Sequence, residues 1–310
     1  MTLGCAAICK NEEHNVISFL ENIAQHGIIN LYISDTGSSD RTVELIRSNW
    51  PKQHLWLSEI NLIPFDFSVA KNSNYDKITN DTHIIHLDLD ERIVGLPKNY
   101  NDHNDIIYPC TRNELLWGTC SHNMSRMTPA KNWWWEFPIH ECLRWSSIYR
   151  YATKDEYSDF VIDHCQVINK DFYSELTELH FNNDPKRLFY HHICDLMRDN
   201  QYLKLTKIFD KYWDNVSSEI PLLQQWQSIR NYQMSRLQIN LKPREDLFDI
   251  FIDNPSQCSF LYLCFFYYHC DNIEKSKEFL YRANNEEFSD YNNRVFYNMN
   301  IKKYTSSLKF

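Results

Sequence analysis

The sequence predicts an α/β domain built on a mostly parallel, Rossmann-like sheet, followed by an all-helical region. Between residue 1 and about residue 91, short apolar runs alternate with stretches of helical period, which is typical of a parallel α/β sheet. At about 97–167 this period fades, and Trp, Pro and short β-like runs indicate irregular strands and loops. The helical period returns after Asp184-Pro185. We therefore expect an α/β domain at 1–180 and a helical domain at 181–310.

The first domain is expected to contain strands separated by helices. The apolar runs predict strands at Leu3–Cys9, Asn30–Ser34, His54–Leu57 and His83–Leu87. The stretches between them predict helices at Val16–Gln25, Asp40–Ser48 and Phe67–Ile78. Ser38 or Ser39 is expected to cap the second helix and Asp66 the third, because their side chains can accept hydrogen bonds from the first turn.

The helical region is expected to form a degenerate array of helical hairpins. Several residues have the spacing of the packing positions in a tetratricopeptide helix pair: Phe260, Leu263, Cys264, Tyr267, Ser276, Leu280 and Ala283. A plain helical bundle explains the same period equally well. A homo-oligomer formed through this region is a further expectation.

Composition limits the partners and the compartment. Lys and Arg total 32 and Asp and Glu total 41, so the formal charge is −9, which repels the phosphates of nucleic acids and anionic lipids. The longest aromatic-apolar run, Phe260 to Tyr268, is far shorter than the ~20 residues that span a bilayer. The ten cysteines include no CxxC pair, as is usual in a reducing cytosol. We expect a cytoplasmic protein with no nucleic-acid partner and no membrane span.

The chain lacks the glycine motifs by which many α/β proteins hold phosphates. Its five glycines have neither GxGxxG nor GxxxxGK[ST] spacing, which excludes ordinary dehydrogenases and P-loop NTPases. A diphosphate bound here needs another source of positive charge, and a divalent ion held by carboxylates can supply it. Asp88 and Asp90 follow the fourth expected strand and point to the same side if that strand continues, so they can hold Mg²⁺ or Mn²⁺.

Four segments lie at or near the ends of the expected strands: Cys9-Lys10-Asn11-Glu12-Glu13, Ser34-Asp35-Thr36-Gly37-Ser38-Ser39-Asp40-Arg41-Thr42, Phe65-Asp66-Phe67-Ser68-Val69-Ala70-Lys71-Asn72 and His86-Leu87-Asp88-Leu89-Asp90-Glu91-Arg92. In these segments the chain resembles the family 2 glycosyltransferases, especially the branch with a tetratricopeptide-like helical tail. Later matches thin out to Ile139-His140-Glu141 and Ile162-Asp163-His164. The resemblance implies a GT-A fold and inverting transfer of a sugar from an NDP-sugar, with UDP favoured, to an acceptor glycan, protein or lipid.

The resemblance also implies roles for residues on the donor side. Asn11 and Glu12 would line the nucleoside pocket, and Asp35 would accept a hydrogen bond from the base. Lys71 would lie near the diphosphate, at a place where relatives often carry Arg.

On the metal and acceptor side, Asp88 would contact the ribose or the metal, and Asp90 would be the main ligand of Mn²⁺ or Mg²⁺. His164 would complete the metal site. Glu141 would be the base that removes the acceptor's proton. Glu136 and Asp163 are its rivals for that role.

Some of these residues also have simpler structural explanations. Asp35, and Asp40 even more so, can cap the helix that follows. Glu12 and Glu13 can complement a helix dipole, and an isolated His such as His164 is more often structural than a ligand.

The segment before Glu141 carries three consecutive tryptophans, Trp133, Trp134 and Trp135. They cannot all face inward in a strand, so at least one should be exposed, where an acceptor or sugar ring could stack on it. The following His140-Glu141 is not an HExxH zinc motif, because position 144 is Arg144.

Two other functions compete with glycosyl transfer. A nucleotidyltransferase also combines a parallel sheet with acidic metal ligands, but it usually has a Gly-rich basic loop near the N-terminus that this sequence lacks. A non-catalytic helical-repeat binding protein with a degenerate transferase domain is the second alternative. Intact Asp35, Asp88 and Asp90 argue against such decay.

Overall fold

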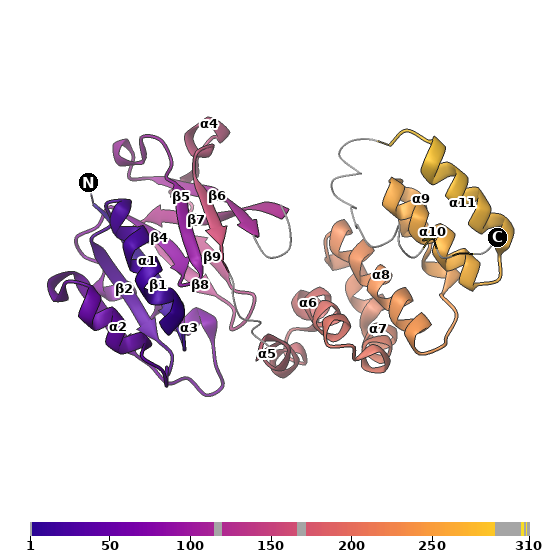
Figure 1. Ribbon diagram of the computed structural model, residues 1–310, viewed down its shortest axis with the longest axis horizontal. Coiled ribbons are helices and arrows are strands. Elements are labelled where there is room, and N and C mark those ends of the chain that lie inside the picture. The colour runs from indigo at the N-terminus through magenta and orange to yellow at the C-terminus, as the bar shows by residue number, and fades with distance from the viewer. Residues whose placement is uncertain (1, 115–119, 166–171, 289–304, 307, 309–310) are drawn as a thin grey trace. The chain divides into compact units, whose positions relative to one another are not determined.

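The computed structural model describes residues 2–114, 120–165, 172–288, 305–306 and 308 (Figure 1). The chain divides into two compact units, Met1–Lys170 and Asp171–Phe310. The first is a mixed α/β unit and the second is helical, so the predicted fold class is confirmed. The division falls before α5 (Phe172–Phe181), whereas the sequence placed the boundary near the end of that helix.

The parallel part of the sheet in the first unit has the strand order β3-β2-β1-β4. These strands are β1 (Leu3–Cys9), β2 (Asn30–Asp35), β3 (Leu55–Glu59) and β4 (His83–Asp88). Side chains such as Cys5 and Ile33 pack with α1 (Glu13–Gln25) and α2 (Thr42–Asn49). The alternate side chains, such as Ala6 and Tyr32, pack against a hairpin of β8 (Trp133–Glu136) and β9 (Cys142–Trp145). Because both faces of the sheet are covered, the sequences of these strands are almost continuous apolar runs.

Beyond β4 the sheet continues with strands of both directions. In the described part of the chain, nine strands form this sheet, in the order β3-β2-β1-β4-β7-β6-β11-β5 with β10 beside β6. The added strands are β5 (Glu91–Gly95), β6 (Ile106–Glu114), β7 (Cys120–Pro129), β10 (Arg150–Tyr151) and β11 (Val161–His164), with the short helix α4 (Lys154–Tyr157) before β11. On β11, His164 pairs with Glu91 of β5, which brings the end of β11 beside the turn between β4 and β5.

The observed ends of α2 and α3 correct two sequence predictions and confirm one. Asp66 accepts from the Val69 N–H at 3.0 Å and caps α3 (Phe67–Asn72), as predicted. The predicted cap of α2 by Ser38 or Ser39 is wrong, because α2 begins at Thr42. The third helix also ends at Asn72 rather than Ile78, and a separate 3₁₀ turn follows at Tyr75–Lys77.

The part of the second unit that the structure describes is helical. The helices are α5, α6 (Pro185–Arg198), α7 (Tyr202–Val216), α8 (Leu222–Gln238), α9 (Asp249–Asp253), α10 (Gln257–His269) and α11 (Ile273–Asn285). Between α10 and α11, the Ser276 hydroxyl donates to the Cys264 carbonyl at 2.7 Å, and the rings of Phe260 and Phe279 lie 5.4 Å apart. The predicted packing position Leu280 is only half-buried, and its neighbour Phe279 is buried instead. The tetratricopeptide likeness therefore stays a prediction. In the described part of the chain, no helix is both long enough and apolar enough to cross a membrane.

Candidate active site

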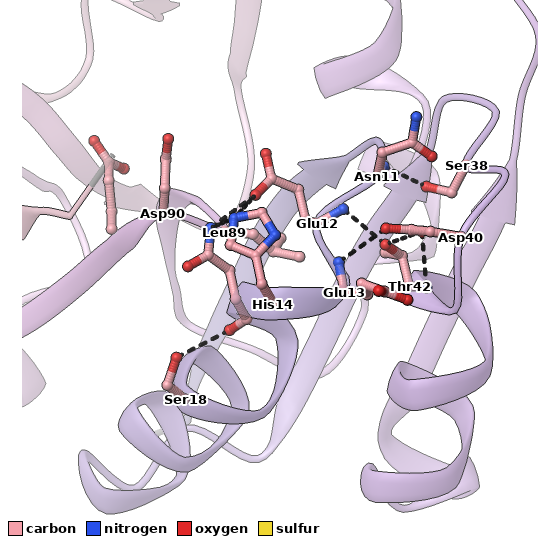
Figure 2. Close-up of polar contacts among 12 residues, drawn as sticks. Asn11, Glu12, Glu13, His14, Ser18, Ser38, Asp40, Thr42, Leu89 and Asp90 are labelled. Atoms are coloured by element: carbon pink, nitrogen blue, oxygen red, sulfur yellow. Dashed lines mark hydrogen bonds and ion pairs between the residues drawn. The ribbon is translucent and has the colours of Figure 1, made fainter. Parts of the chain in front are cut away.

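The loops that follow β1 and β2 are bonded to each other at the carboxyl edge of the sheet (Figure 2). Asn11 has φ 55°, in the left-handed region, which turns its backbone N–H toward the Ser38 hydroxyl at 2.9 Å. Its side-chain oxygen accepts from the Ser39 N–H at 2.7 Å. The next residue, Glu12, donates its N–H to the Thr42 hydroxyl at 2.8 Å. These bonds connect the start of α1 to the start of α2.

Asp40 stabilises this connection between the starts of α1 and α2. Its carboxylate accepts from the Thr42 N–H and hydroxyl at 3.0 and 2.6 Å, and from the Glu13 N–H at 3.1 Å. Burial alone would raise the pKa of Asp40, but the hydrogen bonds from Thr42 and Glu13 outweigh it and lower this pKa. The structural explanation of Asp40 and Glu13 is thus the one that the geometry favours.

Asp35 lies at the end of β2, where it is 3% exposed. One carboxylate oxygen accepts from the N–H groups of Gly37 and Ser38 at 3.1 and 3.0 Å, and the other accepts from the Ser38 hydroxyl at 2.5 Å. Asp35 therefore closes the turn after β2 and does not cap α2, which begins further along the chain.

Glu12 lies beside the first turn of α1 and is 7% exposed. Its carboxylate accepts from the Asn15 side chain at 2.8 Å. In Figure 2 the side chains of Glu12 and Asp90 project in the same direction, away from α1. Glu12 therefore lies at the carboxyl edge of the sheet, between β1 and α1.

A buried lysine connects two of the predicted site residues. The Lys71 ammonium lies 3.1 Å from an oxygen of Asp88 and 2.9 Å from an oxygen of Glu141, and it lies 4.4 Å from the centre of the Trp135 ring. Burial alone would lower the pKa of Lys71, but the negative charges of Asp88 and Glu141 raise it above its ordinary value. Residues from α3, β4 and the hairpin loop thus meet around one positive charge.

The loop that carries Glu141 is fixed to α3. Asn72 donates to the Trp135 carbonyl and accepts from the Trp135 N–H, both at 2.8 Å, so its amide takes the place of a neighbouring strand. The Phe67 N–H donates to the Pro138 carbonyl at 2.9 Å. Phe137 has φ 77°, a conformation that costs about 1–3 kcal/mol for a residue with a side chain and is often found at functional sites.

A buried ionic network lies next to Asp88. Its members were not among the site residues predicted from the sequence. Glu91 is fully buried; its carboxylate accepts from Arg126 at 2.7 Å and from the Asp88 N–H at 2.9 Å, and it forms an ion pair with Nε of Arg112 at 2.7 Å. Arg126 also lies 3.6 Å from the Asp88 carboxylate. The two arginines come from β6 and β7. Charged residues inside strands of a sheet would have been the available signal.

The strand that was expected to carry both Asp88 and Asp90 does not continue as far as Asp90. β4 ends at Asp88, and residues 89–90 form a turn before β5. Asp90 instead lies with its carboxylate 3.3 Å from Nε2 of His164. Asp90 is 4% exposed, and its carbonyl accepts from the Cys165 N–H at 2.7 Å. Of the predicted metal ligands, Asp90 pairs with His164 and Asp88 pairs with Lys71.

The described residues do not by themselves form a complete metal site. No group of three or more His, Cys, Asp and Glu side chains among them is arranged to hold an ion. Asp90 and His164 still fit as two ligands of one ion, because their nearest atoms are about as far apart as adjacent ligands of a small divalent ion.

The rival carboxylates have other partners. Glu136 is about half exposed and lies 2.9 Å from Nε of Arg144, whereas Asp163 accepts from the Asn113 side chain at 2.8 Å. Of the three tryptophans, Trp133 and Trp135 are buried and Trp134 is 46% exposed, which confirms that at least one of them faces outward.

No protein-family model matches the chain, and no curated protein sequence matches it. Among solved structures, the chain is similar to TarS of S. aureus. One TarS structure has a TM-score of 0.38 and 11% identity, over 91% of this chain and 55% of that chain, so the present chain spans about half of its length. A structure of TarS 1–349 in complex with UDP has a TM-score of 0.35 and 11% identity, over 94% and 95% of the two chains. Another structure of TarS 1–349 has a TM-score of 0.34 and 9% identity, over 93% of each chain. At this level of similarity, residue roles have to be argued from the site itself.

Proposed function

We propose that the first unit is a glycosyltransferase that moves a sugar from an NDP-sugar, with UDP-sugars favoured, to an acceptor glycan, protein or lipid. The observation that carries the proposal is the meeting of Lys71, Asp88 and Glu141 at the carboxyl edge of a parallel sheet. Ligands of open α/β sheets bind outside this edge. A buried ammonium beside a carboxylate provides what transfer needs there, namely positive charge for a diphosphate and an acceptor for a proton.

On the donor side, Lys71 would contact the diphosphate. Its present partners, Asp88 and Glu141, keep the ammonium charged and hold it in place before a donor arrives. Asp88 would then contact the ribose, while Asn11, Glu12 and Asp35 would border the nucleoside. Since both Asp35 oxygens already hold the turn after β2, contact with the base would add to a carboxylate that is already positioned.

Asp90 and His164 would hold a divalent ion, Mn²⁺ or Mg²⁺, with diphosphate oxygens as further ligands. Magnesium sites commonly use one or two carboxylates together with substrate phosphates, so two protein ligands are enough. When bound, the ion would supply positive charge at the departing diphosphate. His164 must be neutral to act as a ligand, and Nε2, which lies 3.3 Å from the Asp90 carboxylate, would be the nitrogen that binds the ion.

Glu141 would be the base of an inverting transfer. It would accept the acceptor's hydroxyl proton while the hydroxyl oxygen forms a bond to the sugar's anomeric carbon and the bond to the diphosphate breaks. Glu141 is favoured over Glu136 because it is less exposed and shares Lys71 with Asp88. Its loop is also fixed to α3 through Pro138.

The test is a panel of NDP-sugars measured by thermal shift and by release of the nucleoside diphosphate. A UDP-sugar should raise the melting temperature and be slowly hydrolysed without an acceptor. Lys71→Met should lose both effects. Lys98→Met, which removes an exposed lysine paired with Asp159 at 2.9 Å, should keep them. Failure of every NDP-sugar to bind the wild-type protein would refute the proposal.

A further inference from the structure

An open groove of about 490 Å³ borders the hairpin of β8 and β9. The residues that line it are different from those assigned above to the donor, the metal and the base. Trp133 and Trp134 of β8 line one part of it, and Tyr75 and Asp76 of the 3₁₀ turn line another. Asn132 also lines it. The groove therefore combines aromatic faces with amide and carboxylate groups.

Trp134 differs from the two tryptophans beside it. Trp133 packs edge-on against Tyr75 and His86, with ring centres 5.0 and 4.5 Å apart, and Trp135 lies under the Lys71 ammonium. Trp134 has no ring or cation partner among the described residues, and it is 46% exposed. An indole left in water within a groove is a place where a ligand with an apolar face can gain free energy by stacking.

One polar group of the groove, Asn132, is held in place by hydrogen bonds. Asn132 has φ 59°; its N–H donates to the Tyr75 hydroxyl at 2.7 Å, and its side chain donates to the Tyr149 hydroxyl at 3.2 Å. The Asp76 carboxylate takes part in no hydrogen bond or ion pair with the described residues, so it can accept from a ligand. A fixed amide and an available carboxylate beside an exposed ring suit a ligand that offers both hydroxyls and a C–H face.

The local charge favours a neutral ligand over a phosphorylated one. Three lysines stand next to groove residues in the sequence, and each has other partners. Lys131 donates to the Ile78 carbonyl and lies 5.3 Å from the centre of the Tyr75 ring. Lys77 donates to the side chains of Ser58 and Asn74, and Lys71 is paired with Asp88 and Glu141. The carboxylate of Asp76 would repel a phosphate.

We propose that this groove binds a saccharide, with one sugar ring stacked on Trp134 and its hydroxyls donating to Asp76. This rests on the proposed function only in one respect: if the first unit is a glycosyltransferase, the saccharide belongs to the acceptor. The connection is α3, because Lys71 enters the ionic cluster while the next residue, Asn72, lines the groove and is bonded to Trp135.

The test measures saccharide binding with no nucleotide present. The labelled full chain is applied to an array of printed neutral and anionic glycans, and the strongest soluble hit is then titrated by calorimetry. Trp134→Ala should weaken binding roughly tenfold or more, as for a stacked aromatic anchor, and Asp76→Asn should weaken it by a smaller factor. Tyr151→Ala, which removes another exposed aromatic of the first unit (56% exposed), should bind as wild type does.

The outcomes separate this proposal from the proposed function. Binding that depends on Trp134 in a protein that takes no NDP-sugar would support the groove and refute the transferase. Hydrolysis of an NDP-sugar, together with equal glycan binding by wild type and Trp134→Ala, would overturn the groove alone. A wild-type protein that binds no glycan on the array, or only phosphorylated ones, would also overturn it.

Discussion

The buried ionic network of Glu91, Arg112 and Arg126 gives the sharpest prediction for the stability of the fold. Glu91→Gln keeps the shape of the side chain but removes the negative charge that two arginines share at 2.7 Å. Removing one partner of a buried ion pair typically costs about 3–5 kcal/mol, because it leaves a charge without compensation. Arg126 would keep Asp88 at 3.6 Å, so we expect the lower end, about 3 kcal/mol, or roughly a hundredfold in the folding equilibrium.

The matched control is Glu59→Gln, which breaks an ion pair with Arg47 in which both side chains are more than half exposed. Such surface pairs contribute about 0–1 kcal/mol. Urea denaturation gives the overall change, and hydrogen exchange followed in peptides of β4, β5 and β7 assigns it to the first unit. Equal stability of the two variants would refute the claim that Glu91 holds the network together.

Three further predictions concern single residues. Asp35→Ala should weaken uridine binding roughly tenfold or more without metal, since a hydrogen bond to a carboxylate contributes about 1.5–3 kcal/mol; unchanged affinity would leave Asp35 as a turn residue only. Glu141→Gln should retain UDP binding but lose about 10²–10⁴-fold in single-turnover transfer, whereas Glu136→Gln should transfer almost normally; the reverse result would reassign the base. Burial lowers the pKa of His83 to about 4 from 6.5, so the unfolded chain binds more protons between these values and stability should fall as the pH is lowered through this range. His83→Phe should remove up to about 3 kcal/mol of that acid sensitivity, measured by urea denaturation at pH 7 and pH 4.5; an unchanged difference would contradict the assignment.

The strands of the parallel sheet could be predicted from sequence because burial on both faces leaves an unbroken apolar run. β1 was predicted with its observed bounds, and β2 and β4 within one residue of their ends. The motifs at the strand ends could also be placed, because parallel strands bring their carboxyl ends to one edge of the sheet.

Features that depend on contacts between distant residues could not be predicted. The early end of α3 reflects Asn72, whose amide is bonded to Trp135 across a sequence separation of 63 residues. The end of β4 at Asp88 and the contact between Asp90 and His164 depend on the turn at 89–90 and on β11, which carries His164. Arg112 and Arg126 act through Glu91 only because β6 and β7 continue the sheet beyond β4. No local period in the sequence carries this information.

The most direct test of the account is a calorimetric titration of the full chain with UDP, with and without Mn²⁺. The proposed site predicts binding that Mn²⁺ strengthens and chelation weakens in the wild type. In Asp90→Asn the Mn²⁺ effect should disappear while the folded structure is retained, because Asp90 and His164 would be the protein ligands of the ion. Equal UDP affinity of wild type and Asp90→Asn, with and without chelator, would contradict the metal site, and absence of UDP binding under every condition would contradict the transferase.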